Sequence, residues 1–370
     1  MKLLILTDGI HPFVIGGMQK HSYNLALGLH QAGHEVVVYH CTYNENQFET
    51  IAQHKLPFKA VHVGFPHAGL KIPGHYIKSS KKYSELLFEK YNAELSSFDG
   101  IYAQGYSAWH YLLHRKSKSI PVVVNFHGLN MFQAASGFKS KLENKMLTKS
   151  VNENLQLSDH VISLGGNLTH VLSSIVAESK IIECPNGINE NWIIDKLELP
   201  VSKKRKLIFI GRNDKVKRLD FLLQEIKPHL NDLELTVIGD TGDTNPESHS
   251  NITFLGNISH EETLINHIDQ AHGLVLTSVS EGLPTVIMEA MARGKVIISS
   301  DVGAVKDLVD ELGGWTFESL NVSEFNDSIK AFLEASDAKL IEMGNHNTNK
   351  VSRKFLWKAV CEQTASIYKR

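Results

Sequence analysis

A strand–loop–helix–strand unit at the start of the chain, repeated near its middle, constrains the fold more than any other feature. In the first copy, the apolar run Leu3–Leu6 precedes a glycine-bearing loop, an amphipathic stretch over Met18–Ala32 and the β-branched run Glu35–His40. Gly33 is a typical C-terminal helix stop. Strands that alternate with helices at this spacing predict a parallel sheet with crossover helices.

The second copy begins at Lys206, with a strand over Leu207–Gly211, a helix over Leu219–Leu230 and a strand over Leu235–Gly239. Because the plan restarts, and 370 residues exceed the usual size of one domain, we expect two doubly wound α/β domains. The linker is expected near Asn189–Arg205. Further predicted strands are Gly100–Ala103, Pro121–Phe126, His160–Leu164, Leu274–Thr277 and Val296–Ser299, and a final amphipathic helix is predicted over Phe355–Tyr368.

The composition is that of an ordinary globular protein, with 42% hydrophobic residues and a net charge of −2. This charge balance carries no signal for binding nucleic acid. The three cysteines lack CxxC spacing and are expected to be buried thiols in a reducing compartment. The first apolar run is too short for a signal segment, so a cytoplasmic location is expected.

The basic stretch Lys71–Lys82 contains interleaved Tyr and Ile. It is interpreted as a solvated loop, with a membrane-surface or acceptor-docking patch as the alternative. The alternative corresponds to a peripheral location at the inner face of the cell membrane.

The most informative segment is SVSEGLPTVIMEAMARGK, which follows the predicted strand Leu274–Thr277. Pro284 suits the first position of a helix that stops at Gly294. Glu281 then lies in the loop at the end of the strand, and Glu289 lies in the second helical turn, with seven residues between them. One carboxylate is placed to face a sugar ring and the other to accept hydrogen bonds from ribose hydroxyls. The helix N-terminus between them offers N–H groups to phosphate oxygens.

Cationic residues follow the strand Leu207–Gly211. Arg212 and Lys217 share one loop before a helix, which is typical of a diphosphate site. A solvated basic loop is the alternative.

Three motifs of the first half are weaker when taken alone. Gly16-Gly17 precedes a helix and allows close backbone approach to an anion, but a plain tight turn is equally compatible. His127-Gly128 follows a predicted strand, where α/β sheets bind ligands, although a structural histidine is common there. The Asn-Gly pair in CPNGIN, Cys184–Asn189, indicates a turn.

Together these segments resemble the retaining glycosyltransferase family 4 of the GT-B fold. The resemblance spans essentially the whole chain, and the motifs come in the family's order. The similar elements are the E-x7-E signature (Glu281 to Glu289), the G-R-x4-K loop (Gly211 to Lys217), the glycine pair, the His-Gly pair, the P-N-G-[IV] element (Pro185 to Ile188) and the closing helix with Trp357 and Tyr368.

The resemblance implies two Rossmann-like domains that face each other across a cleft. The acceptor-side domain would comprise residues 1–190 with the closing helix, about 353–370. The donor-binding domain would comprise residues 200–352.

The resemblance also implies a role for each matching residue. Arg212 and Lys217 would neutralise the donor diphosphate, Glu289 would hold the ribose, and Glu281 would contact the transferred sugar. His127 would lie beside the reacting sugar, and the Gly16-Gly17 backbone would touch a phosphate oxygen.

The family often has Gly-Phe-Gly after the first Glu, whereas this chain has Leu283, Pro284 and Thr285 after Gly282. Pro284 has no N–H, so one backbone donor is missing, while Thr285 keeps its amide and adds a hydroxyl. The base is expected to be read through backbone near Gly256–Ser259, including Ile258.

The implied reaction moves a hexose or N-acetylhexosamine from a UDP-sugar, in preference to a GDP-sugar, to a carbohydrate or lipid-linked hydroxyl acceptor. Surface polysaccharide or glycolipid synthesis is the expected context. No metal or other cofactor is implied, because the two cations and the helix dipole neutralise the diphosphate. Front-face attack is favoured over double displacement through Glu281.

Two other classes remain as alternatives: a GT-B nucleotide-sugar epimerase and a non-catalytic nucleotide-sugar-binding partner subunit. A dehydrogenase is disfavoured because neither half carries GxGxxG.

Overall fold

The computed structural model describes residues 1–14, 16–41, 55–66, 74–116, 120–132, 138–240 and 249–369. The chain divides into two compact units: Met1–Gly187 with Trp357–Arg370, and Ile188–Leu356. The boundaries therefore lie at Gly187/Ile188 and Leu356/Trp357. The segment expected as a linker, Asn189–Arg205, begins the second unit.

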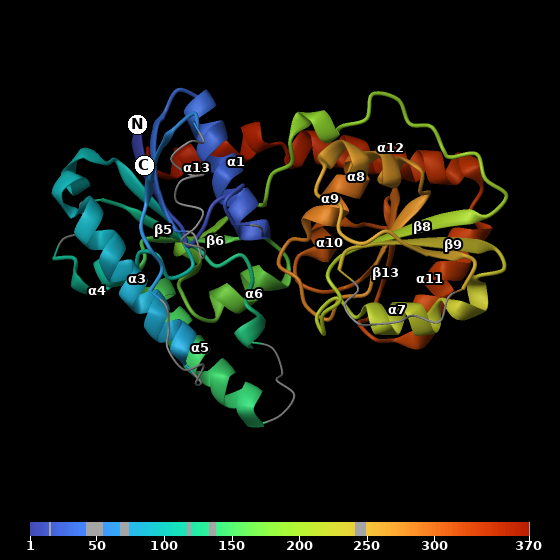
Figure 1. Cartoon of the computed structure of the whole chain (residues 1–370), viewed down its shortest axis with the longest axis horizontal. Coiled ribbons are helices and arrows are strands. Elements are labelled where there is room, and N and C mark those ends of the chain that lie inside the picture. The colour runs from blue at the N-terminus through green and yellow to red at the C-terminus, as the bar shows by residue number, and fades with distance from the viewer. Residues whose placement is uncertain are drawn as a thin grey trace. The chain divides into compact units, whose positions relative to one another are not determined.

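The first unit is built on a seven-stranded sheet in the order β3-β2-β1-β4-β5-β6-β7, parallel at every pairing (Figure 1). Its strands are β1 (Lys2–Leu6), β2 (Glu35–His40), β3 (Lys59–His62), β4 (Gly100–Gln104), β5 (Val122–Asn125), β6 (His160–Ser163) and β7 (Ile181–Glu183). Its helices are α1 (Gly17–Gln31), α3 (His75–Tyr91), α4 (Trp109–His114), α5 (Phe138–Leu157), α6 (Asn167–Ser173) and α13 (Trp357–Ile367).

The second unit holds a six-stranded parallel sheet in the order β10-β9-β8-β11-β12-β13. Its strands are β8 (Arg205–Ile210), β9 (Leu233–Ile238), β10 (Ile252–Phe254), β11 (Gly273–Leu276), β12 (Val296–Ser300) and β13 (Gly314–Phe317). Its helices are α7 (Leu219–Glu225), α8 (Glu261–Asp269), α9 (Thr285–Ala292), α10 (Val305–Leu308), α11 (Val322–Glu334) and α12 (Asp337–Lys354). The 3-10 helices of the described chain are Asn92–Ser97, Asn130–Phe132, Glu178–Lys180, Glu190–Trp192 and Lys227–His229.

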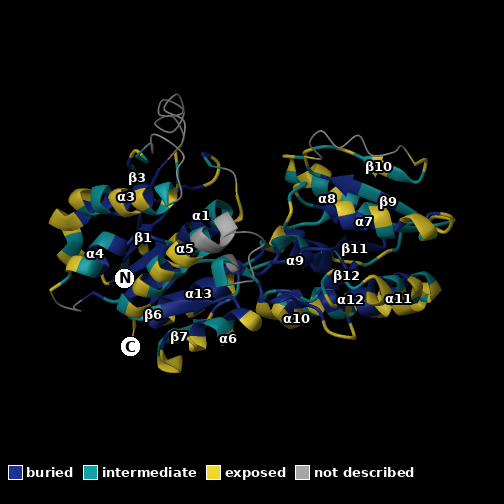
Figure 2. Cartoon of the chain, turned by 90° about the horizontal axis from the view of Figure 1, so that it is seen from below, coloured by how far each residue is buried: buried dark blue, intermediate teal, exposed yellow. Residues whose placement is uncertain are grey.

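The central strands are continuous apolar runs because helices cover both faces of a parallel sheet. Four of the five residues of β1 and all four residues of β11 are buried. Figure 2 shows these strands in dark blue, while exposed residues gather on the outer helices. In the second unit, Phe221, Phe317 and Phe325 pack edge to face, with ring centroids 5.4 to 5.6 Å apart. The apolar runs of the sequence therefore mark the two cores.

Each sheet has one point where the strand order reverses. In the first unit, β1 lies between β2 and β4, and in the second unit β8 lies between β9 and β11. The loops that follow the two central strands diverge at such a point and leave a crevice at the carboxyl edge, where open α/β sheets bind their ligands. The topology thus singles out the loops after β1 and β4, and the loops after β8 and β11.

Three sequence-based expectations about local structure are wrong. Of the basic stretch expected as a loop, residues 71–73 lie outside the described residues, and His75–Lys82 form the first half of α3. The helix expected over Leu219–Leu230 ends at Glu225 and continues as the 3-10 helix Lys227–His229, because Pro228 has no N–H for the α-helical ladder. Pro284 precedes α9 as its N-cap instead of forming its first residue.

The edge strands β3, β7, β10 and β13 were not predicted. Three of them contain no buried residue, so their apolar signal is weak. The expected buried thiols are confirmed, since all three cysteines are free and buried. Among the described helices, none is both long and apolar enough to cross a membrane.

The last helix, α13, belongs to the first unit and lies beside α1 (Figure 1). Cys361 Sγ donates to the Leu25 carbonyl of α1 at 3.8 Å, and Tyr368 Oη donates to the Ile101 carbonyl of β4 at 3.0 Å. The chain therefore returns to the first unit for its final helix.

Candidate functional site

In the second unit, two loops meet at the point where the strand order reverses. One follows β8 and carries Arg212 and Lys217; the other follows β11 and carries Glu281. The loops are joined by hydrogen bonds: Thr277 Oγ1 donates to the Lys217 carbonyl at 3.1 Å, and the Val279 amide donates to the Val216 carbonyl at 2.8 Å. Their side chains are therefore held in a fixed relation.

Lys217 and Glu281 form an ion pair at this point. Lys217 Nζ lies 2.6 Å from Glu281 Oε1, and the two side chains are 19% and 11% exposed. Ser278 Oγ donates to the same carboxylate oxygen at 2.5 Å. A cation and an anion that are 64 positions apart in the sequence are thus placed side by side in a partly desolvated crevice, where charge interactions are stronger than in bulk water.

Local hydrogen bonds orient Lys217 on its loop. Asp214 Oδ1 accepts from the amides of Val216 and Lys217, at 3.0 and 2.9 Å, which closes a turn by side chain to backbone bonding. Arg218, which follows, has a left-handed backbone with φ of 51°. The turn points Lys217 toward the loop after β11.

Arg212 is placed differently. Its side chain is 84% exposed and its guanidinium lies 3.5 Å from the Asp214 carboxylate, a loose surface pairing. The structure therefore brings Lys217 and Glu281 together and leaves Arg212 extended into solvent on the same loop.

The turn after β12 packs against the backbone of the loop that carries Glu281. The Ala304 amide donates to the Gly282 carbonyl at 3.0 Å, and Gly303 has φ of 60°. A Cβ at Gly303 would lie 2.2 Å from the Glu281 carbonyl oxygen, so only glycine allows this approach. The position of Glu281 thus depends on a residue from the next strand's loop.

Helix α9 begins directly after this loop. Leu283, Pro284 and Glu289 are buried, and Thr285 is half-buried. Pro284 is the N-cap; among the described residues no side-chain hydrogen bond caps the helix, and its first turn contains no acidic residue. The amide end of the helix therefore retains its partial positive charge beside Glu281.

The loop with Ile258 lies at the same edge of the sheet. The Gly239 amide at the end of β9 donates to the Gly256 carbonyl at 2.9 Å, and Ile258 is half-buried. The segment predicted to read the base is therefore tied to the strand beside β8.

In the first unit, the glycine pair precedes α1. Gly16 is the N-cap of α1, Gly17 is its first residue, and both are exposed. A Cβ at Gly17 would meet nothing within 4 Å among the described residues. The backbone is thus accessible at the start of this helix.

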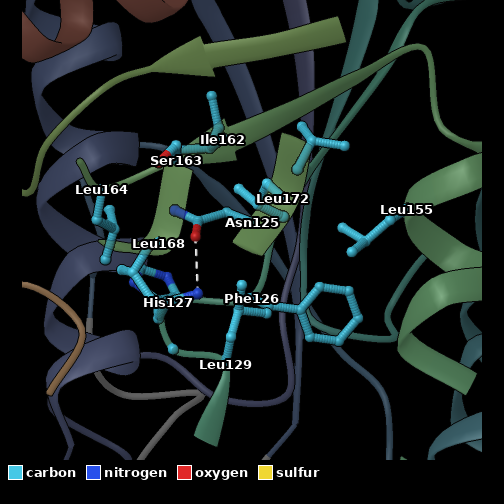
Figure 3. Close-up of a pocket in the computed structure, with 12 residues that line it drawn as sticks. Asn125, Phe126, His127, Leu129, Leu155, Ile162, Ser163, Leu164, Leu168 and Leu172 are labelled. Atoms are coloured by element: carbon cyan, nitrogen blue, oxygen red, sulfur yellow. Dashed lines mark hydrogen bonds between the residues drawn. The ribbon is translucent and has the colours of Figure 1, made fainter. Parts of the chain in front are cut away.

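His127 follows β5 in a left-handed conformation with φ of 57°, which is uncommon for a residue other than glycine. Asn125 Oδ1 accepts from the His127 amide at 2.8 Å (Figure 3). The His127 ring nitrogen Nε2 lies 2.5 Å from Gln104 Oε1 at the end of β4. Side chains of two adjacent strands therefore fix both the backbone and the ring of His127.

A second histidine supports the first. The His21 ring of α1 lies edge-on to the His127 ring, with centroids 4.5 Å apart. Burial lowers the pKa of His21 to about 4, and burial together with His21 holds the pKa of His127 well below its usual value. Both rings are neutral near pH 7, so His127 acts there as a hydrogen-bonding group and not as a cation.

His21 and its neighbour Trp357 contact the Pro-Asn-Gly-Ile segment, Pro185–Ile188, which gives these residues a structural role. The buried Asn186 hydrogen-bonds to His21, and the Trp357 ring of α13 lies 5.1 Å from the His21 ring. A Cβ at Gly187 would lie 2.4 Å from the Trp357 ring, so this glycine admits the tryptophan. Sequence reasoning missed His21, Gln104 and Tyr102, which form hydrogen bonds around His127. The available signal was Gln104, a polar residue at the end of the otherwise apolar strand β4.

Beneath His127 lies a small cavity of about 10 Å³ (Figure 3). Its walls are largely apolar and include Leu155, Leu164, Leu168 and Leu172. This volume is about that of one water molecule, so the cavity is a packing defect and not a substrate site.

The two halves of the chain match two family models. Residues 15–192 match the model described as Glycosyltransferase Family 4, and residues 204–335 match the one described as Glycosyl transferases group 1. An uncharacterized glycosyltransferase of Methanocaldococcus jannaschii is 22% identical over 98% of this chain and 97% of its own length.

Solved structures share the fold. Sucrose-phosphate synthase from Thermosynechococcus elongatus superposes with a TM-score of 0.81 at 18% identity, over 100% of this chain and 98% of that one. Anabaena HepE, solved in complex with UDP-glucose, gives a TM-score of 0.72 at 15% identity, over 100% and 99% of the two chains.

Two doubly wound parallel units, with the candidate residues at the strand-order reversals, have the architecture of the GT-B fold. The chain belongs to the group 1, family 4 glycosyltransferases. It is therefore a transferase.

Proposed function

We propose that this glycosyltransferase moves a hexose or N-acetylhexosamine from a nucleotide-diphosphate sugar to a hydroxyl acceptor, with retention of the anomeric configuration. UDP is the favoured nucleotide over GDP. The observation that carries the proposal is the Lys217–Glu281 pair beside the uncapped start of α9. The likeness to HepE, solved with UDP-glucose, supports the same class of donor.

The charge and position of each candidate residue in the second unit suggest its role. Lys217 and Arg212 would bind the diphosphate, and the amides at the start of α9, including Thr285, would add neutral donors. The exposed Arg212 is free to swing onto an incoming anion, whereas Lys217 exchanges part of its contact with Glu281. Glu281 would accept hydroxyls of the transferred sugar.

The nucleoside would lie toward the buried side of the same loops. Glu289, in the second turn of α9, would accept hydrogen bonds from the ribose hydroxyls. Leu283 and Pro284 would line the start of α9, and the loop at Ile258 would meet the base.

In the reaction, the bond between the anomeric carbon and the β-phosphate oxygen breaks, and negative charge grows on the departing diphosphate. Prepositioned Lys217, Arg212 and helix amides stabilise that charge, which is the electrostatic form of catalysis. The acceptor oxygen attacks the same face of the sugar, and its proton passes to the departing phosphate. No metal takes part in this scheme, so excess EDTA should leave the rate unchanged.

Front-face attack is favoured over a covalent glycosyl intermediate on Glu281. Glu281 Oε1 already accepts from Lys217 Nζ and Ser278 Oγ, and these two donors lower the nucleophilicity of that oxygen. Trapping a sugar on Glu281 with a slow fluorinated donor would overturn this preference.

The candidate residues of the first unit would contribute hydrogen-bonding groups without charge. The Gly16-Gly17 backbone would donate to a phosphate oxygen. His127, neutral and fixed by Gln104, would hydrogen-bond a hydroxyl of the reacting sugar.

The proposed context is surface polysaccharide or glycolipid synthesis, with a carbohydrate or lipid-linked acceptor handled at the inner face of the cell membrane. Lys78, Lys81 and Lys82 are exposed on α3 and supply positive charge for such a contact. Sedimentation with anionic vesicles, compared with neutral ones, tests this part.

Incubation with a panel of UDP- and GDP-sugars tests the function as a whole. We expect slow hydrolysis of one donor to free sugar and nucleoside diphosphate, and NMR of the transfer product should show the donor's anomeric configuration. Conversion to an isomeric nucleotide sugar would identify an epimerase instead. Binding without turnover, with any acceptor supplied, would identify a non-catalytic subunit.

A further inference from the structure

Three serine side chains of the second unit lie at the carboxyl edge of three neighbouring strands. Ser278 follows β11, Ser300 ends β12 and Ser319 follows β13. Ser278 and Ser300 are fully buried, and Ser319 is half-buried. The three residues are well separated in the sequence, and the strand order β11-β12-β13 brings them to one place.

The carbonyl of Ser278 is the point where the three serines meet. Ser300 Oγ donates to this oxygen at 2.6 Å, and Ser319 Oγ donates to it at 3.2 Å. A carbonyl oxygen has two lone pairs, so these two donors fill its capacity. The backbone of Ser278 is therefore held from β12 and β13, on the side of β11 opposite to β8 and its loop with Lys217.

The hydroxyl of Ser278 contacts the carboxylate of Glu281. Ser278 Oγ donates to Glu281 Oε1 at 2.5 Å, and Lys217 Nζ lies 2.6 Å from the same oxygen. An ionised carboxylate only accepts, so the hydroxyl is the donor. Glu281 Oε2 has no hydrogen-bond partner within the described part of the chain, and 11% of the side chain is exposed. One oxygen of Glu281 is thus anchored, and the other is left to bind a ligand.

Binding of a donor would change the two contacts of Oε1 unequally. Lys217 would turn part of its contact to the diphosphate, which weakens its bond to Glu281. Ser278 is fully buried and cannot follow an incoming anion, so its hydroxyl would stay on Oε1. A carboxylate that is held through one oxygen keeps the direction of the other, and a reacting sugar requires such a fixed geometry.

We propose that Ser278 is a positioning residue: it holds Glu281 through Oε1, so that Oε2 receives a hydroxyl of the transferred sugar. Ser300 and Ser319 support this role because they fix the backbone of Ser278. The assignment rests on the donor binding proposed above. Ser278 acts through the carboxylate of Glu281 and does not itself contact the sugar.

The test compares two serines that undergo the same substitution. Ser278→Ala removes the hydroxyl that is bonded to Glu281. Ser299→Ala removes another fully buried hydroxyl of the same unit, which donates to the Ser300 carbonyl at 3.1 Å. Isothermal titration calorimetry measures the binding of UDP-glucose and GDP-mannose, each compared with its own nucleoside diphosphate, UDP or GDP. Thermal melts show whether each variant is folded.

We expect the unaltered chain to bind one nucleotide sugar, with an affinity that falls about tenfold in Ser278→Ala. The affinity for the matching nucleoside diphosphate should stay unchanged, because Glu281 is assigned to the sugar and not to the nucleotide. Ser299→Ala should leave both affinities unchanged. Ser278→Cys keeps the side chain in place but offers only a weak S–H donor, so it should behave like Ser278→Ala.

The proposal is overturned if Ser278→Ala and Ser299→Ala bind the nucleotide sugar equally well. It is also overturned if Ser278→Ala weakens the nucleotide sugar and the nucleoside diphosphate by the same factor, since that result indicates a general loosening of the loop. If the unaltered chain binds neither nucleotide sugar, the proposed donor site is refuted, and the role of Ser278 is refuted with it. The behaviour of the unaltered chain therefore distinguishes the two failures.

Discussion

The two units share one topology but have opposite chemistry at the same place. Where the strand order reverses in the second unit, Lys217 and Glu281 form a partly buried ion pair with Arg212 nearby. The corresponding place in the first unit holds aromatic rings, an amide and a neutral histidine. The shared topology therefore sets where the loops lie, and the loop residues set their chemistry; in the function proposed above, the charged loops of the second unit bind the anionic part of the donor.

The largest expected effect concerns the charged side of this comparison. Lys217→Ala should lower kcat by about two orders of magnitude or more, because a preorganised cation facing the leaving group is lost. Arg212→Ala should act in the same direction. Steady-state rates with the preferred donor provide the measurement, and Lys215→Ala, an exposed lysine of the same loop, is the control. Near-normal turnover in both variants would refute the assignment.

Nucleotide binding should stabilise the second unit selectively. At a hundredfold excess over Kd, UDP should raise the stability by about 2.7 kcal/mol. Hydrogen exchange read by mass spectrometry should show protection in the loops after β8 and β11. Lys217→Ala should abolish the gain, while Tyr106→Phe in the first unit should keep it. If UDP protects only the first unit, the nucleotide binds there and not in the second unit.

Acid should destabilise the first unit before the second. Among the described histidines, burial lowers the pKa of His21 and His40 in the first unit to about 4, and His127 is held low as well. In the second unit burial lowers only the pKa of His272, also to about 4.

A folded pKa below the ordinary value means that the unfolded chain binds protons first as the pH falls from about 6.5 to 4. Each such histidine then removes about 1.4 kcal/mol of stability per pH unit in this window. Hydrogen exchange at pH 7, 5.5 and 4.5 should show the first unit losing protection earlier, and His21→Gln should flatten its pH dependence. Simultaneous loss in both units would contradict this expectation.

The smallest effect concerns the residue that departs from the family pattern. Pro284→Ala should change the donor KM by less than about threefold, because Pro284 is a helix N-cap with no N–H and the substitution removes no donor. Thr285→Pro is the informative partner: proline is tolerated at the first helical position, so a loss of about tenfold or more would report the Thr285 amide. If the two variants change the donor KM equally, the amide at the start of α9 does not bind the phosphate.

Sequence reasoning could nominate candidate residues in the second unit because the signals there are local. Glu281 and Glu289 are joined by one loop and one short helix, and Arg212 and Lys217 share a single turn. It did not predict that Lys217 would pair with Glu281, since their contact depends on β8 and β11 being neighbours in the sheet. His127 became a candidate through its place after a predicted strand together with the resemblance, and its supports His21 and Gln104 come from distant elements.

The sequence by itself determined two α/β units, their central strands and the short motifs that identify a glycosyltransferase, because apolar runs, glycines and local spacings act over a few residues. Only the tertiary structure decided which loops meet. One pocket of the first unit is lined by Asp8 after β1, Tyr76 of α3, Gln104 of β4, Phe126 after β5 and Leu147 of α5, and these positions have no shared spacing in the chain. The strand order β3-β2-β1-β4-β5 brings them together, and strand order follows from how the whole sheet packs, not from any one segment.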